Sequence, residues 1–185
     1  LDMIEGLIGE ENKSNEALQS IANGKWSKAE LVGKLININA DLSDKAIKYT
    51  DTIKKLTGGD TLSAQRKYED PFKFVNTAHL IFSCNELPII YDYNEAFFNR
   101  LHIVHCPNEF KGDDQDPDLI NKLTTKEAKS HILNRAIDGL RRLLNRGYFK
   151  ETKHTREQLK KYKFGNDSVA QFLNESIKLI EDTNV

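Results

Sequence analysis

Apolar residues follow a strand pattern in some segments of the chain and a helix pattern in others, and these patterns predict where its elements lie. Runs rich in apolar and β-branched residues, typical of strands, occur at 35–39, 61–68, 71–75, 78–84 and 101–105. Apolar residues at helical spacing occur at 3–8, 15–22, 44–58, 94–99, 125–146 and 168–180. Strands therefore alternate with helices up to about residue 106, and helices follow. The pattern predicts an α/β sheet domain with a helical extension.

Short local signals place several element ends. Ser27 and Glu30 form a capping box ahead of a brief helix, and Asp44 is expected to cap the helix that Gly58-Gly59 ends. Glu69-Asp70-Pro71 is a turn signal, so the strands on either side are expected to form a hairpin. Asp167-Ser168 caps the last helix, and Gly147 ends the long one before it.

The long helix at 125–146 has a pronounced apolar face. Its simplest interpretation is a helix that packs this face into the core. The face consists of Ala128, Ile132, Leu133, Ala136, Ile137, Leu140, Leu143 and Leu144.

Composition limits the class of protein. The 185 residues are 38% hydrophobic and 30% charged, which suits one globular domain or slightly more and does not suit a disordered chain. No apolar run approaches the ~18 residues that a membrane span needs. Cys84 and Cys106 lie inside apolar runs, which favours reduced thiols in a cytoplasmic protein over a disulfide framework.

The net charge is only −1, but it is unevenly distributed. Residues 109–118 are mainly acidic, and residues 141–163 are mainly basic. A charge run can be simply a solvated helix face, and a basic stripe of this density can also neutralise phosphates. The basic residues are Arg141, Arg142, Arg146, Lys150, Lys153, Arg156, Lys160, Lys161 and Lys163.

Three polar residues lie at or beside the ends of predicted strands, where ligands collect in open α/β sheets. Asp41 follows "LININA", Asn85 follows "HLIFSC", and Arg100 precedes "LHIVH". A carboxylate, an amide and a guanidinium at one edge suit phosphate chemistry. Each also has a plainer interpretation: Asp41 begins a turn, Asn85 ends a strand before a proline turn, and Arg100 caps its helix.

The order and context of four blocks favour the first interpretation. "LININADLSD", "IKKLTGGDTLSAQRKYEDPFKF", "AHLIFSCNELP" and "EAFFNRLHIVHCP" together resemble the superfamily 3 helicases, in particular the primase-helicases of phages, plasmids and poxvirus-type viruses. The resemblance runs from about residue 24 to 150. It implies a partial AAA+ nucleotide-motor sheet flanked by helices.

The resemblance also implies roles for particular residues. Asp41 would be the acidic residue of the Walker B strand, acting on Mg²⁺ or the attacking water. Asn85 would sense the γ-phosphate of ATP, and Arg100 would be an arginine finger offered to the neighbouring subunit. The hairpin residues Arg66, Lys67 and Tyr68 would contact single-stranded DNA in the channel of a ring.

Two features depart from the family's pattern. Ala40 stands where a second acidic residue is usual, and the P-loop motif G-x-x-x-x-G-K-[ST] does not occur in the 185 residues. We therefore expect Leu1 to begin inside or just after the P-loop helix of a longer protein, so that this chain alone is inactive. The expected divisions are a motor core at 1–108, its helical part at 109–150, and a linker with the start of a winged-helix domain at 151–185.

The expected parent is an ATP-dependent replicative DNA helicase that forms a homo-oligomeric, hexameric ring, uses ATP and Mg²⁺, and can carry a primase domain. It would act in the cytoplasm, or in the host cytoplasm if encoded by a phage, plasmid or virus, without a membrane partner. The alternative is a non-enzymatic DNA-binding or oligomerisation module derived from such a motor. A third interpretation is an α/β interaction domain whose basic stripe only aids solubility.

Two other motifs are weaker. His102, His105 and Cys106 could suggest zinc, but on a strand His102 and His105 would point to opposite faces. Cys84 lacks an evident base in the sequence, so a buried structural thiol is the default.

Overall fold

The structure, a computed structural model, describes the backbone of residues 1–182 except 41, 44, 48–49 and 92, and the side chains as far as residue 176 with the same gaps. The helices are α1 (Asp2–Ile8), α2 (Leu18–Asn23), α3 (Lys25–Ala29), α4 (Asp51–Gly58), α5 (Glu95–Phe98), α6 (Leu119–Leu123), α7 (Lys126–Arg146), α8 (Lys153–Asn166) and α9 (Ser168–Asp182). Short 3-10 turns are η1 (Glu10–Asn12) and η2 (Gly112–Asp114). The strands are β1 (Lys13–Ser14), β2 (Ile36–Asn39), β3 (Thr61–Ala64), β4 (Phe72–Val75) and β5 (His79–Phe82).

A small parallel sheet has the strand order β1-β2-β5. The central strand β2 pairs with β5 from Ile36 opposite His79 to Asn39 opposite Phe82. Three consecutive residues of β2, from Ile36 to Ile38, are buried, as expected for a parallel strand covered on both faces. The predicted α/β class is therefore confirmed.

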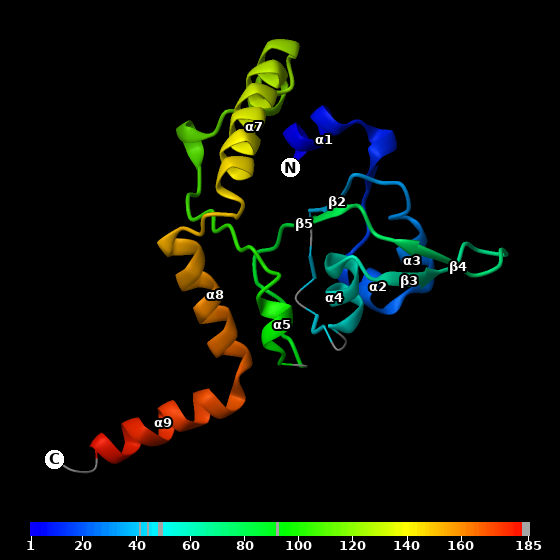
Figure 1. Ribbon diagram of the computed structural model, residues 1–185. Coiled ribbons are helices and arrows are strands. Elements are labelled where there is room, and N and C mark those ends of the chain that lie inside the picture. The colour runs from blue at the N-terminus through cyan, green and yellow to red at the C-terminus, as the bar shows by residue number, and fades with distance from the viewer. Residues whose placement is uncertain (41, 44, 48–49, 92, 183–185) are drawn as a thin grey trace.

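Strands β3 and β4 form a separate antiparallel hairpin, as the turn signal predicted. In Figure 1 this hairpin extends away from the body of the molecule, with its loop at the far tip. Leu62 and Ala64 face inward from β3 and are buried, while Thr61 and Ser63 are exposed. The hairpin is thus anchored along one face only.

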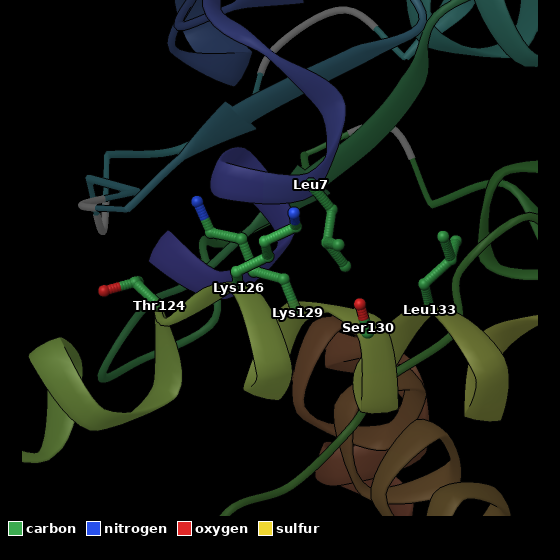
Figure 2. A pocket seen from close by; sticks show the side chains of 6 residues that line it. All are labelled: Leu7, Thr124, Lys126, Lys129, Ser130 and Leu133. Carbon is green, nitrogen blue, oxygen red and sulfur yellow. The ribbon is translucent and has the colours of Figure 1, made fainter.

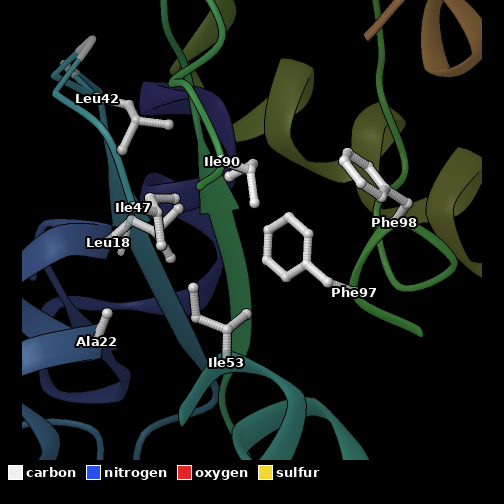
Figure 3. Close-up of a cluster of buried hydrophobic side chains, with 8 residues drawn as sticks. All are labelled: Leu18, Ala22, Leu42, Ile47, Ile53, Ile90, Phe97 and Phe98. Atoms are coloured by element: carbon white, nitrogen blue, oxygen red, sulfur yellow. The ribbon is translucent and has the colours of Figure 1, made fainter. Parts of the chain in front are cut away.

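In the main hydrophobic core, side chains of α2, α4 and α5 pack against residues of the segments that follow β2 and β5 (Figure 3). An isolated parallel bridge between Ile47 and Ile90 runs through it. A second cluster lies beneath the hairpin and contains Ile21, Leu31, Leu56 and Leu62. The main core consists of Leu18, Ala22, Leu42, Ile47, Ile53, Ile90, Phe97 and Phe98.

Several predicted elements differ from the structure. Residues 101–105 form no strand, because no neighbouring strand pairs with this alternating sequence. The helix expected from Asp44 begins only at Asp51, since Ile47 pairs with Ile90 in extended form, and Asp44 itself lies outside the described residues. Ser27 is inside α3, which begins after Gly24 without a side-chain cap, so the expected capping box is absent.

Helix α7 forms where the sequence predicted it, but its apolar face is not packed into the core as expected. The side chain of Thr125 accepts a hydrogen bond from the Ala128 backbone N–H, and Gly147 ends the helix in a left-handed conformation. None of its residues is buried, although α1 and α6 pack against part of it. Periodicity tells which face of a helix is apolar, and it does not tell whether a partner covers that face.

Helix α8 was not expected. The Thr152 side chain accepts a hydrogen bond from the Thr155 backbone N–H at its start, and Leu159 and Tyr162 pack against the main core. In the described part of the chain, every helix is too short or too polar to cross a lipid bilayer.

Candidate functional site

Hydrogen bonds join the segments that follow β2 and β5 beyond the ends of these two strands. The backbone N–H of Ser83 donates to the Asn39 carbonyl at 3.1 Å, and the Leu42 N–H donates to the Ser83 carbonyl at 2.9 Å. The Ser83 hydroxyl also donates to the Ala40 carbonyl at 2.6 Å. Both sequence neighbours of Asp41 are therefore bonded to Ser83, two residues before Asn85. Asp41 itself lies outside the described residues.

An amide network holds β1 against β2 at the same end of the sheet. Asn37 is fully buried, and its Oδ1 accepts from the Ser14 hydroxyl at 2.9 Å and from the Glu16 N–H at 2.8 Å. Its Nδ2 donates to the Glu16 carbonyl at 2.9 Å. Two residues further along β2, Asn39 Nδ2 donates to Asn15 Oδ1 at 2.9 Å. Two uncharged amides of β2, Asn37 and Asn39, thus bind the segment that follows β1.

Helix α2 holds the loop that follows this edge. The Gln19 side-chain amide donates to the carbonyls of Ser43 at 2.9 Å and Lys45 at 3.0 Å. These bonds fix the chain on the far side of Asp41. Gln19 was not expected to act here, because its partners are more than twenty residues away and no local pattern marks them.

Asn85 is exposed in a bend directly after β5. The loop that follows is held by α8, where the Tyr162 hydroxyl donates to the Pro88 carbonyl at 2.6 Å and Asn166 Oδ1 accepts from the Ile90 N–H at 2.6 Å. Burial and the nearby Cys84 raise the pKa of the Tyr162 phenol. Burial also raises the pKa of the Cys84 thiol, which keeps it a neutral structural group at ordinary pH.

Arg100 lies at the exposed end of α5. Its Nη1 donates to the Ala96 carbonyl of the same helix, and its Nη2 lies near Gly58 at the end of α4. Among the described residues, no hydrogen bond or ion pair joins Arg100 to Asn85. The contact with Ala96 matches the capping interpretation, while the exposure leaves the guanidinium accessible to another molecule.

The hairpin tip presents aromatic and basic groups to solvent. Tyr68 is 92% exposed and has a φ of 66°, a left-handed conformation that is unusual for a bulky residue. The Lys67 ammonium lies 5.0 Å from the Tyr68 ring centroid. Arg66 lies over the Phe72 ring at 5.3 Å and 3.8 Å from the Glu69 carboxylate, which offsets part of its charge. Lys67 and Tyr68 are therefore the freest contact groups at this tip.

Helix α3, next to the start of the hairpin loop, adds an aromatic residue that sequence reasoning did not select. Helix α3 packs against β3, and the Gln65 N–H donates to the Lys25 carbonyl at 3.2 Å. Trp26 follows and is 57% exposed. Burial, and to a smaller extent the charge of Lys55, lowers the pKa of Lys28 on the same helix. The sequence "GKWSK" shows a Trp between two lysines, but it does not show that this Trp is exposed beside the hairpin.

Oxygen donors at the strand-end edge suit a hard cation such as Mg²⁺. Asn39 Oδ1 is buried and has no hydrogen-bond partner among the described residues, so one acceptor there remains unused. In the described part of the chain, no three His, Cys, Asp or Glu side chains gather closely enough to hold a metal.

His102 and His105 do not lie on a strand, and each contacts a different part of the chain. His102 lies against the Phe149 ring, and His105 Nδ1 lies 2.9 Å from His154 Nε2. Cys106 is exposed.

Together these features define an α/β protein with a parallel sheet, polar strand ends at one edge and a projecting basic-aromatic hairpin. Residues 2–116, which include the sheet and the hairpin, match the family described as "Family of unknown function (DUF5906)". Because the match covers well over half of the chain, the protein belongs to this family. Comparison with curated proteins gives no match.

Proposed function

We propose that this chain is part of the motor of an ATP-dependent, ring-forming DNA helicase of the superfamily 3 type. The observation that carries the proposal is a pair of hydrogen bonds at Ser83: its hydroxyl donates to the Ala40 carbonyl, and its carbonyl accepts from the Leu42 N–H. They bring the chain around Asp41 next to the strand that leads to Asn85. Phosphoryl transfer to water uses a carboxylate that helps hold the metal and a residue that orients the attacking water, and a neutral amide can do the latter.

Each residue then has a distinct task. Asp41, two residues after Asn39 in the sequence, would hold Mg²⁺, which when bound neutralises charge on the phosphates. The Asn85 amide can both donate and accept, so it orients a phosphate oxygen or a water without repelling either. Arg100, exposed at the end of α5, would stabilise negative charge on the nucleotide of an adjoining subunit.

The hairpin would bind single-stranded DNA with little sequence preference. Tyr68 offers a free ring for base stacking, and Lys67 beside it offers a charge for the phosphates. Trp26 on α3, next to the start of the hairpin loop, offers a further exposed ring.

Fluorescence anisotropy of the purified chain with labelled oligothymidylate tests the DNA contact. Tyr68→Ala is expected to weaken binding by about 1–3 kcal/mol through lost stacking. Lys67→Ala is expected to weaken binding and to reduce the salt slope by about one. Lys111→Ala, which removes an exposed lysine of the acidic segment 109–118, is the control and leaves binding unchanged. Equal DNA affinity in all four proteins would remove the hairpin from the proposal.

Hydrolysis is tested on the protein extended to include the sequence encoded upstream of Leu1. DNA-stimulated ATPase activity is expected, and Arg100→Ala is expected to abolish it. Arg156→Ala on α8 is the control for loss of an exposed arginine. Mixing Arg100→Ala subunits with Asp41→Ala subunits should restore part of the activity, because each supplies what the other lacks. An Arg100→Ala protein with full turnover would refute the finger assignment.

The alternative is a DNA-binding module without hydrolysis, which the lack of a P-loop motif in these 185 residues favours. In that case the Tyr68 and Lys67 effects persist, while the extended protein hydrolyses no ATP.

A further inference from the structure

The second half of α7 carries an uncovered apolar seam. Leu133, Ile137, Leu140 and Leu144 are spaced by four, three and four residues, as in the contact line of a coiled coil. Their exposed fractions are 49, 38, 52 and 71%. Four large apolar side chains in one line on a surface indicate a helix-binding face.

Helix α1 covers the first half of α7 and leaves the rest open. Figure 2 shows Leu7 of α1 directed toward α7, over a hollow of about 450 Å³ that Lys129 and Leu133 also line. Beyond Leu133 the seam continues toward Gly147, where Tyr148 and Phe149 are also exposed.

The seam is set in a basic surface. Residues 135–146 contain four arginines and one acidic residue, Asp138, which lies 3.1 Å from Arg141. The arginines are Arg135, Arg141, Arg142 and Arg146, and all are exposed. A partner helix therefore needs an apolar stripe with acidic neighbours.

Helix α9 of this same chain has those properties. Val169, Phe172 and Leu173 are exposed at helical spacing, and Glu175 next to them is exposed as well. By sequence α9 contains three acidic residues, Glu175, Glu181 and Asp182, against Lys178. In Figure 1 it runs away from the rest of the molecule beyond α8, far from α7 of its own chain.

We propose that α9 of one copy packs into the α7 seam of a second copy. The seam from Leu133 to Leu144 is about 17 Å long and α9 about 22 Å, so the helix spans the seam completely. Because the two surfaces differ, the contact is head-to-tail, and such contacts build rings or filaments. The inference goes beyond the proposed function, since the contact needs neither nucleotide nor DNA, and it specifies which surfaces would join neighbouring copies.

Sedimentation of the purified chain over a range of concentrations tests the contact. The wild-type chain is expected to form assemblies larger than dimers. Leu140→Glu and Phe172→Glu, both at exposed positions, are each expected to lower the association constant on the order of 30-fold or more, as for a central contact residue. Val75→Glu, at an exposed apolar position on β4 of the projecting hairpin, is the control and associates like wild type.

Mixing gives the decisive result. An equimolar mixture of Leu140→Glu and Phe172→Glu chains forms dimers and nothing larger, because one intact α9 meets one intact α7. A wild-type chain that stays monomeric, a mixture without dimers, or a Phe172→Glu chain that associates like wild type each overturns the proposal. Circular dichroism confirms that the variants retain their helices. None of these outcomes depends on ATPase activity or DNA binding, so the proposed function is tested separately.

Discussion

The buried amide of Asn37 gives the sharpest test of how the strand-end edge is held together. Its side chain makes three hydrogen bonds of 2.8–2.9 Å, one with the Ser14 hydroxyl and two with the backbone of Glu16. A neutral hydrogen bond contributes about 0.5–1.5 kcal/mol net, and a buried group left without a partner adds to the loss. Asn37→Ala is therefore expected to lower the free energy of unfolding by about 3 kcal/mol.

Urea unfolding followed by circular dichroism measures this loss, and an unchanged m-value shows that the unfolded state is comparable. Ser14→Ala removes one of the three bonds and should cost about 1 kcal/mol. In the double variant the Ser14→Ala effect should nearly vanish, since its partner is already gone.

Asn85→Ala is the matched control, because this asparagine is exposed after the neighbouring strand. It should change stability by less than about 0.5 kcal/mol. If Asn37→Ala were as mild as Asn85→Ala, the network would not hold β1 against β2, and the account of the edge would be wrong.

Three further predictions concern Tyr162 of α8 and the cysteine Cys84 near it. Tyr162→Phe removes the hydrogen bond to the Pro88 carbonyl and should cost about 1 kcal/mol in urea unfolding, while Tyr148→Phe, at an exposed tyrosine, should cost nothing measurable. Iodoacetamide at mildly alkaline pH should modify exposed Cys106 at least about tenfold faster than Cys84, because burial raises the pKa of the Cys84 thiol; equal rates would contradict that burial. The raised pKa values of Cys84 and Tyr162 contribute stability that is complete below their usual values of 9.0 and 10.0 and is lost as the pH rises above them, because the unfolded chain releases these protons first. Unfolding free energies measured across this range should therefore fall less steeply in the Cys84→Ala/Tyr162→Phe variant than in wild type, and parallel curves would refute the assignment.

The sequence predicted the elements whose signals are local. The hairpin followed from Glu69-Asp70-Pro71, β5 from an apolar run, and α7 from its period and from Gly147 at its end. It failed where tertiary contacts decide the outcome. The alternation at 101–105 found no strand to pair with, and Ile47 paired with Ile90 instead of continuing a helix.

Helix α8 shows the same limit for the candidate site. Its sequence is mostly polar, and Leu159 and Tyr162 are its main core contacts, so it has no clear period of apolar residues that would predict a helix. The bond between Tyr162 and Pro88 joins residues 74 positions apart. Such a contact has no local signature, whereas the position of Asn85 after a strand does.

These contacts link the helical extension to the strand-end edge. Ser83 is bonded to the β2 side, and Pro88 and Ile90 are bonded to α8, so the bend that carries Asn85 is held from both directions. Helix α8 is also tied to α5 by the ion pair between Lys163 and Glu95 and by the edge-to-face contact of Tyr162 with Phe98. Since α9 continues directly from the end of α8, a partner that binds α9 acts on a helix bonded directly to the loop after Asn85. The extension is therefore better understood as a support of the candidate site than as an independent appendage.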